Sequence, residues 1–136
     1  MTLALSLRNP WPTLITRAGC RVINRHWPTD HRGRIMLHVS KTPCNSKEWA
    51  EAIDIFALAH PARRSIYFPL PADMPRGGLF ASALLVDCVS RPPSDAMGGR
   101  WFIGPYGFVL RDVRAIPFRR WRGDVGLFEV PDHFAA

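Results

Sequence analysis

Cysteine, lysine and long apolar runs are all scarce in this sequence, and each shortage excludes a class of protein. The three cysteines, Cys20, Cys44 and Cys88, are odd in number and form no CxxC pair, which excludes a disulfide framework and a zinc knuckle. The longest apolar runs, Ile55–Ala59 and Ala83–Val86, are too short to span a bilayer, and the N-terminal residues carry no basic signal-peptide region. We therefore expect a soluble, cytoplasmic protein with reduced thiols and no membrane association.

Basic residues outnumber acidic ones by 18 to 11, which gives a net charge of +7. All of the basic residues except Lys41 and Lys47 are arginine. This surplus favours an anionic partner, with nucleic acid first, because neutralising phosphates releases counterions. With 136 residues and 47% hydrophobic content, the chain fits a single domain over residues 1–136.

The first third of the chain alternates short extended segments with one short helix. Leu3–Leu7 places large apolar residues at every second position, which predicts a half-buried strand. Pro12–Arg17 is predicted to be a helix, since proline suits a first helical turn and Gly19 can close the helix. Arg21–Asn24 returns to extended structure. Arg34–Ser40 alternates again, so that one face enters the core and the other is available to line a site.

One longer helix and three further strands are predicted in the rest of the chain. Asn45 followed by Glu48 resembles a capping box, and the apolar spacing after it predicts a helix over Ser46–His60. Arg91–Arg100 contains two prolines and two glycines and is predicted to be a loop. The strands are expected at Leu79–Ser90, Phe108–Val113 and Val125–Val130. Together the elements predict an α+β fold, a small mixed β-barrel of about five to six strands with two or three inserted helices.

The segment Asn24–Arg34 surrounds Trp27 with six cationic or titratable side chains, and a second aromatic corner, Asn9–Pro12, precedes it. Guanidinium groups bind phosphates in a bidentate manner and stack on bases, and an indole offers a base a flat face. The combination predicts a nucleotide-sized pocket. The structural alternative is a turn whose tryptophan caps the core and whose arginines are solvated.

Seven segments form a pattern that is specific through their order and spacing. They are Ala4–Trp11, Asn24–Thr29, Arg32–Arg34, His38–Lys41, Gly78, Gly104–Leu110 and Gly123–Phe128. In this order they resemble the ASCH domain, a branch of the PUA-like β-barrel superfamily, over essentially the whole chain. The resemblance implies a single ASCH-like domain with a PUA-like barrel and a cleft between that barrel and its inserted helices. It also implies an RNA-associated or coactivator-associated module.

The motif at the mouth of that cleft is of the G-x-K-x-x-E-N-R type, and this sequence keeps only part of it. Asn24–Arg25 preserves the Asn-Arg pair, while Cys20 falls on the motif lysine and Ile23 on the motif glutamate. Relatives in the superfamily hold a modified base in an aromatic cage, hydrolyse acetylated cytidine or resemble ribonucleases. Since neither Cys20 nor Ile23 simply replaces an amine or a carboxylate, the cleft looks better suited to holding a ligand than to transforming one.

The candidate binding residues combine aromatic faces with hydrogen-bonding and cationic groups. We expect Trp11 and Trp27 to stack on a base whose edge Asn24 reads. Arg25 and Arg32 are expected to hold its phosphate or to close the pocket. The full set of predicted ligand-binding residues is Pro10, Trp11, Asn24, Arg25, Trp27, Arg32, His38, Lys41, Trp101 and Tyr106.

Two later segments of the sequence are candidates for ligand binding, and each can also be explained by a purely structural role. Trp101 and Tyr106 are candidate rim residues because the flanking glycines permit close backbone approach, and the alternative is an ordered turn. Arg119–Arg122 is a basic cluster with a tryptophan that suits a phosphate backbone, and the alternative is a solvated hairpin.

Catalytic and metal-binding roles find less support in the sequence. Cys20 with His38 or His26 is a candidate nucleophile and base if the fold brings them together, and the alternative for Cys20 is a small buried hydrophobe. The spacings of His26, His31 and His38 match no established metal site, so neither a metal nor a cofactor is predicted.

The leading hypothesis is a module that binds RNA, single-stranded nucleic acid or a nucleotide-like small molecule in a basic, tryptophan-lined cleft. One alternative is an enzyme that acts on nucleic acid or on a modified nucleoside, either as an acetylcytidine amidohydrolase or as a ribonuclease. Another is a protein-interaction module of a transcription or translation complex. The sequence does not show whether the protein is an enzyme, and it does not show the oligomeric state.

Overall fold

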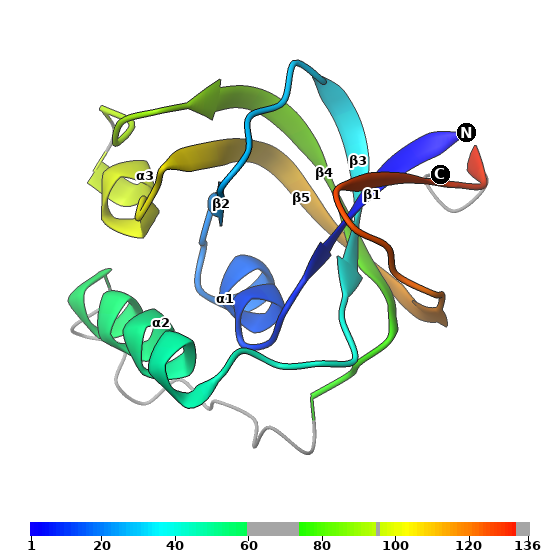
Figure 1. The fold of residues 1–136 in the computed structure, drawn as a ribbon, viewed down its shortest axis with the longest axis horizontal. Coiled ribbons are helices and arrows are strands. Elements are labelled where there is room, and N and C mark those ends of the chain that lie inside the picture. The colour runs from blue at the N-terminus through cyan, green and yellow to red at the C-terminus, as the bar shows by residue number, and fades with distance from the viewer. Residues whose placement is uncertain (60–73, 95, 133–136) are drawn as a thin grey trace.

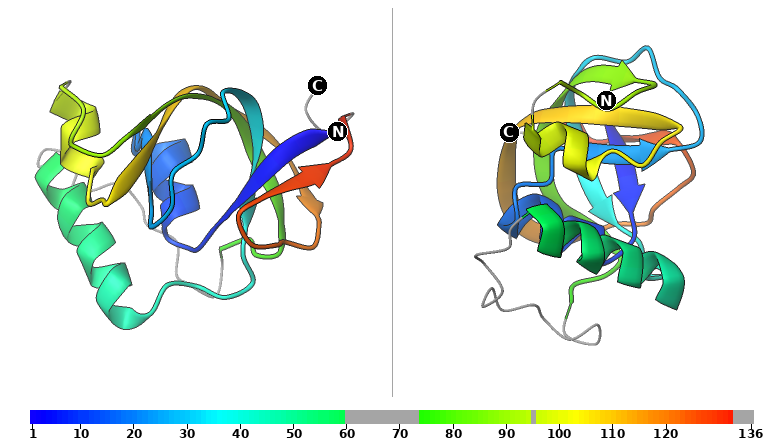
Figure 2. Two further views of the ribbon diagram at one scale, coloured as in Figure 1. Left: turned by 45° about the horizontal axis from the view of Figure 1, so that its top comes forward. Right: turned by 90° about the vertical axis from the view of Figure 1, so that its left-hand side faces the viewer.

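Six strands form one curved sheet, and three helices lie beside it (Figure 1). The computed structural model describes residues 1–59, 74–94 and 96–132. In chain order the elements are β1 (Thr2–Leu7), α1 (Trp11–Arg17), β2 (Val22–Arg25), β3 (Gly33–Val39), α2 (Ser46–Ala59), β4 (Gly78–Val89), α3 (Ala96–Trp101), β5 (Tyr106–Arg120) and β6 (Leu127–Val130). Figure 2 shows α1 within the curve of the sheet. None of the helices in the described ranges is long and apolar enough to cross a membrane.

The strand order is β2-β5-β4-β3-β1-β6, in which β1 and β3 run parallel and all other neighbours run antiparallel. The α+β class and the number of strands confirm the prediction. The closed barrel was wrong: within the described residues, β2 and β6 remain the two edges of the sheet. Each edge strand has four residues and pairs with one neighbour, β2 with β5 and β6 with β1. The space between β2 and β1 is lined by their side chains and forms a cavity.

The strands β1 and β3 are buried on both faces. Leu5 and Leu37 point into the main core, together with α1, Trp101 and Phe108. The residues next to them along the strands belong to a second, smaller cluster on the opposite face, which consists of Ala4, Met36, Leu79 and Val130 with Ile116, Trp121 and Phe128 packed against it. The period-two alternation of a strand therefore places Ser6 and His38 on this second face, away from the main core.

Most predicted elements are confirmed, with two differences. The Asn45 side chain accepts a 2.9 Å hydrogen bond from the Glu48 amide, so the predicted cap is present, and the Glu48 carboxylate accepts from Asn45 Nδ2 at 3.2 Å rather than from the Asn45 backbone amide. The helix α2 ends at Ala59, and His60 lies outside the described residues. The predicted loop at Arg91–Arg100 contains most of α3. The two glycines of this helix lower its helix propensity, and the complete burial of Trp101 stabilises it nevertheless. The predicted strand Phe108–Val113 extends to Arg120, since β5 pairs with β4 along most of its length.

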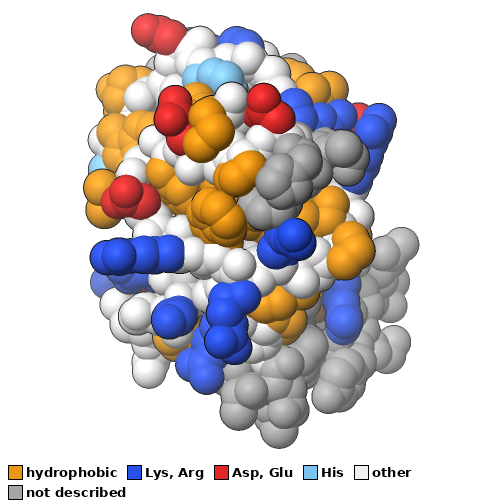
Figure 3. Space-filling model, turned by 90° about the vertical axis from the view of Figure 1, so that its right-hand side faces the viewer, with side chains coloured by type: hydrophobic (Ala, Val, Ile, Leu, Met, Phe, Trp, Pro, Cys, Tyr) orange, Lys and Arg blue, Asp and Glu red, His pale blue; other side chains and the backbone are white. Residues whose placement is uncertain are grey.

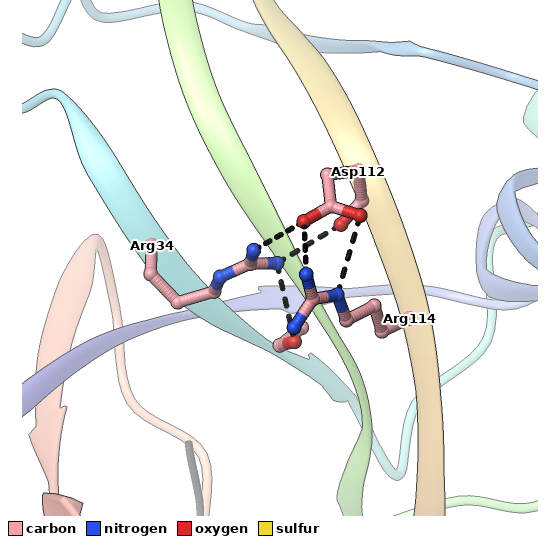
Figure 4. A network of polar contacts seen from close by, with 4 residues as sticks. Arg34, Asp112 and Arg114 are labelled. Atoms are coloured by element: carbon pink, nitrogen blue, oxygen red, sulfur yellow. Dashed lines mark hydrogen bonds and ion pairs between the residues drawn. The ribbon is translucent and has the colours of Figure 1, made fainter. Parts of the chain in front are cut away.

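A bulge bends β5 at Asp112, which adopts a positive φ of 49° where the register between β4 and β5 shifts. Figure 4 shows the Asp112 carboxylate between two guanidinium groups, those of Arg34 from β3 and Arg114 from β5. Arg34 also donates to the Asp112 carbonyl at 2.9 Å and to the Ser82 hydroxyl at 3.4 Å. These contacts tie three neighbouring strands together where the ladder is irregular.

Candidate functional site

Two cavities adjoin each other at β1. The first, the Trp27 cavity, has a volume of about 730 Å³ and lies between β1, β2, α1 and the start of α2. The second, the His38 cavity, has a volume of about 940 Å³ and lies where β1 and β3 meet the segment 120–125. Ser6, Ser40, Asp124 and Val125 line both. A ligand longer than one nucleotide can therefore contact both cavities at once.

Two tryptophans, Trp11 and Trp27, contribute to the wall of the Trp27 cavity. Trp27 packs edge-to-face against Phe108, with ring centroids 5.1 Å apart, and Trp11 packs against Trp101 at 6.4 Å. Both Trp11 and Trp27 stay partly exposed. Core aromatic rings therefore hold the two indoles in place, and each indole retains surface that a base can contact.

Asn24 lines the Trp27 cavity, but its side chain is engaged with the backbone of the segment after α3. Its Oδ1 accepts hydrogen bonds from the amides of Ile103 (2.8 Å) and Gly104 (3.1 Å). Its Nδ2 donates to the Trp101 carbonyl at 3.0 Å. With its oxygen already doubly occupied, Asn24 anchors the segment 101–104 and is poorly placed to read the edge of a base.

Arg25 also has a structural role in the same cavity. Its guanidinium donates to the Asn24 carbonyl at 2.8 Å and to the Ser6 carbonyl at 2.6 Å. Burial, together with repulsion from Arg8, lowers the pKa of Arg25 to about 10, so the group remains protonated at neutral pH. Neither Arg8 nor Arg25 has a salt bridge to another described residue. The mutual repulsion of the two guanidinium groups favours a negative charge nearby, and acidic residues of the same cavity supply part of it.

Positive charge is concentrated at the His38 cavity rather than in the Trp27 cavity. Acidic residues counter the two arginines of the Trp27 cavity; they are Glu48, Glu51 and Asp124. Lys41, Arg120 and Arg122 line the His38 cavity, where Asp124 is the only acidic lining residue among those that the structure describes. Figure 3 shows Lys and Arg side chains gathered on the lower half of the corresponding side of the molecule, the side where β5 ends in Figure 1. The sequence predicted one cleft that is both basic and tryptophan-lined, whereas in the structure the excess of cations and the two tryptophans line two adjoining cavities.

His38 lines the His38 cavity, but its side chain is almost completely buried and is 2% exposed. Its Nε2 lies 2.7 Å from the Trp121 carbonyl, which can only accept, so Nε2 carries the proton. Its Nδ1 lies 2.9 Å from the Ser6 hydroxyl and accepts a hydrogen bond from it. Burial lowers the pKa of His38, and the Trp121 carbonyl partly opposes this effect. The imidazole is therefore neutral at pH 7.

The other predicted binding residues line neither cavity. Trp101 was predicted at a rim, but it is fully buried in the main core. Arg32 donates to the Thr29 and His31 carbonyls and faces Asp87 at 3.7 Å, so it braces the segment before β3. Pro10 is buried before α1, and Tyr106 pairs with Arg25 across β5 and β2. Of the ten predicted residues, six line one of the two cavities and these four do not.

The two positions that depart from the family motif have different surroundings. Ile23 lines the Trp27 cavity, whereas Cys20 is completely buried and its thiol donates to the Val22 carbonyl. Burial raises the pKa of Cys20 to about 12, which leaves no thiolate for catalysis at neutral pH. Cys44 does line the cavity, but burial and Glu48 raise its pKa to about 12 as well. Cys20 is therefore a small buried core residue.

Sequence reasoning missed several residues that line the cavities. Ser6 and Arg8 bracket the end of a predicted strand, and their position in the pattern gives no sign of a partner. Glu48 was recognised only as a cap. Among the described residues, no three His, Cys, Asp or Glu side chains come together as metal ligands would.

Comparison with known proteins finds one distant similarity. No family model matches the chain. Over 87 residues the chain is 32% identical to Activating signal cointegrator 1 of Homo sapiens and equally to that of Mus musculus. The match covers 64% of this chain but 14% of each relative, so the chain corresponds to a small part of those proteins. Activating signal cointegrator 1 contains an ASCH domain, and the chain is thus distantly similar to a protein that carries the domain its sequence resembles.

Proposed function

We propose that the protein is an ASCH-like module that binds RNA or single-stranded nucleic acid, or a nucleotide-like small molecule. The observation that carries the proposal is the adjacency of the two cavities. One offers the exposed surfaces of Trp11 and Trp27, and the other offers the cations Lys41, Arg120 and Arg122. Stacking surfaces beside a basic groove are the two components of sequence-tolerant binding to single strands.

The arrangement suggests a direction for the ligand. A base enters the Trp27 cavity, where its phosphate meets Arg8 and the remaining donors of Arg25. The next phosphates lie over the His38 cavity and are neutralised by its lysine and arginines. In this proposal Asn24 acts indirectly, because it holds the segment 101–104 in place rather than contacting the base.

The test is fluorescence anisotropy with a labelled single-stranded RNA of mixed sequence, measured at several salt concentrations. Trp27→Ala should lose about 1–3 kcal/mol of binding free energy, roughly 5- to 150-fold in Kd. Arg122→Gln should lower the slope of log K against log salt by about 1, because one phosphate contact is lost. Arg17→Gln is the matched control, since Arg17 is exposed at the end of α1 and lines neither cavity.

A folded Trp27→Ala variant that binds as tightly as the wild type, with no salt dependence in either protein, would contradict the proposal. Competition experiments, in which nucleosides and nucleoside monophosphates displace the labelled RNA, test the Trp27 cavity by itself. Monophosphates should compete better, because only they place an anion beside Arg8 and Arg25.

A further inference from the structure

We propose that Ser6 and His38 form the nucleophile and general base of a site that hydrolyses carboxylic esters carrying an anionic group. The inference is independent of nucleic-acid binding. It rests on a chain of two hydrogen bonds, from the Ser6 hydroxyl to His38 Nδ1 (2.9 Å) and from His38 Nε2 to the Trp121 carbonyl (2.7 Å). A hydroxyl bonded to an imidazole that a third group orients is the arrangement that activates serine.

Strand pairing and the packing of a later segment together position Ser6 and His38. Ser6 and His38 are register partners in the parallel ladder of β1 and β3, so their side chains emerge side by side on the second face of the sheet. The segment after β5 then closes over the ring: a Cβ atom at Gly123 would lie 2.6 Å from His38 Cε1. Phe128 packs against the imidazole at 5.7 Å with an interplanar angle of 84°. The ring is therefore held in one orientation and one tautomer.

The two residues differ in exposure as their roles require. His38 is 2% exposed, whereas Ser6 is partly exposed and lines both cavities. A substrate therefore has more of Ser6 than of His38 to contact, while the imidazole still lines the same cavity and can exchange protons with the leaving alcohol and with water. The charged residues that line the same cavity are Lys41, Arg120, Arg122 and Asp124. Their positive excess attracts an anionic substrate and favours the negative charge that develops on its carbonyl oxygen during attack.

The reaction balances with water as the only co-reactant. Ser6 Oγ forms a bond to the ester carbonyl carbon as its proton moves to His38 Nδ1, and Nε2–H stays bonded to the Trp121 carbonyl. Collapse of the tetrahedral intermediate breaks the bond between carbon and the alcohol oxygen, and His38 returns the proton to that oxygen. Water then attacks the carbonyl carbon of the acyl-Ser6 ester as His38 Nδ1 takes its proton. Collapse of this second tetrahedral intermediate breaks the bond between carbon and Ser6 Oγ, His38 returns the proton to Oγ, and a carboxylic acid leaves. Ser6 is thereby regenerated.

The experiment treats the full chain with a fluorophosphonate probe, which phosphonylates activated serines, and locates the adduct by peptide mass spectrometry. We expect modification of Ser6, together with turnover of an aryl succinate monoester, whose free carboxylate suits the basic cavity. Ser40 lines both cavities and is an internal control, because a non-specific probe would modify it equally. Failure to label Ser6, or equal labelling of Ser40, overturns the proposal.

Two further measurements test the role of His38. His38→Gln should slow labelling of Ser6 by about 100-fold or more if the base is lost and the fold is kept, as checked by circular dichroism. If this variant does not fold, the pH profile of the wild type decides. Labelling should rise to a plateau that is reached near neutral pH, because burial lowers the pKa of His38. A rate that keeps rising tenfold per pH unit above pH 8 would show an unassisted hydroxyl and would refute the assignment. Each result is separate from RNA binding, which anisotropy measures on the same protein.

Discussion

Replacing Gly123 by alanine tests whether the segment after β5 fixes His38. A Cβ atom at this position would lie 2.6 Å from His38 Cε1 and 3.0 Å from Nδ1. Ordinary carbon contacts are about 3.5–4.0 Å, so the ring or the backbone must move by about 1 Å. The ring cannot retreat freely, because Ser6 and the Trp121 carbonyl hold both nitrogens and Phe128 packs against its side.

We expect Gly123→Ala to lower the free energy of unfolding by about 1–3 kcal/mol, the usual cost of overpacking a site that cannot relax. Urea denaturation followed by tryptophan fluorescence measures it. Gly126→Ala is the comparison in the same segment: a Cβ there meets nothing within 4 Å, but its φ of +64° is unfavourable for alanine. That variant should lose about 1 kcal/mol through backbone strain alone.

A double-mutant cycle separates the two causes. His38→Ala removes the atoms that the new methyl group would meet, so adding Gly123→Ala to that variant should cost almost nothing, whereas Gly126→Ala should cost the same in both backgrounds. The reasoning fails if Gly123→Ala is equally destabilising with and without the His38 ring.

Three further predictions concern the fold. Trp101→Ala should lower the free energy of unfolding by about 3–5 kcal/mol, since the ring is fully buried; urea denaturation that shows a loss below 1 kcal/mol would contradict its place in the core. Asn45→Ala should cost about 1 kcal/mol through the lost α2 cap, and Asn45→Asp should restore it in the same assay. Arg34 and Arg114 hold the pKa of Asp112 below its ordinary value, so its stabilising effect is present above that ordinary value and is lost as pH falls through the lower folded-state value. The stability difference between the wild type and Asp112→Asn should therefore shrink on acidification, and a constant difference between pH 7 and pH 2 would refute the role of the carboxylate.

Local patterns in the sequence identified most elements because each depends on neighbouring residues. Alternation located β1 and β3, a long run of small and apolar residues located β4, and the Asn45 cap located the start of α2. Alternation does not predict which strands pair with each other. The parallel pairing of β1 with β3 brings Ser6 to His38 across a crossover that contains α1 and β2, and nothing near either residue in the sequence indicates it.

The site residues were predicted unevenly for a related reason. Trp11 and Trp27 line a cavity and also pack against the main core, so the cavity and the core contact that were alternatives for Trp27 in the sequence occur together. Asn24 and Arg25 have the donors and acceptors of ligand-binding groups, but the backbone already engages them. Whether a polar side chain is free to hydrogen-bond a ligand depends on how many nearby backbone groups need hydrogen-bond partners. That number is known only from the folded structure.

Ser6 belongs to both cavities through different atoms. Its carbonyl accepts a hydrogen bond from Arg25, and its hydroxyl contacts His38. We therefore expect the two cavities to be thermodynamically linked, with an occupant that draws Arg25 away from the carbonyl acting as an effector of the hydroxyl. By reciprocity, an adduct on the hydroxyl changes the affinity of the first cavity by the same factor. Nucleotide binding measured before and after phosphonylation of Ser6 would give the size and sign of that coupling.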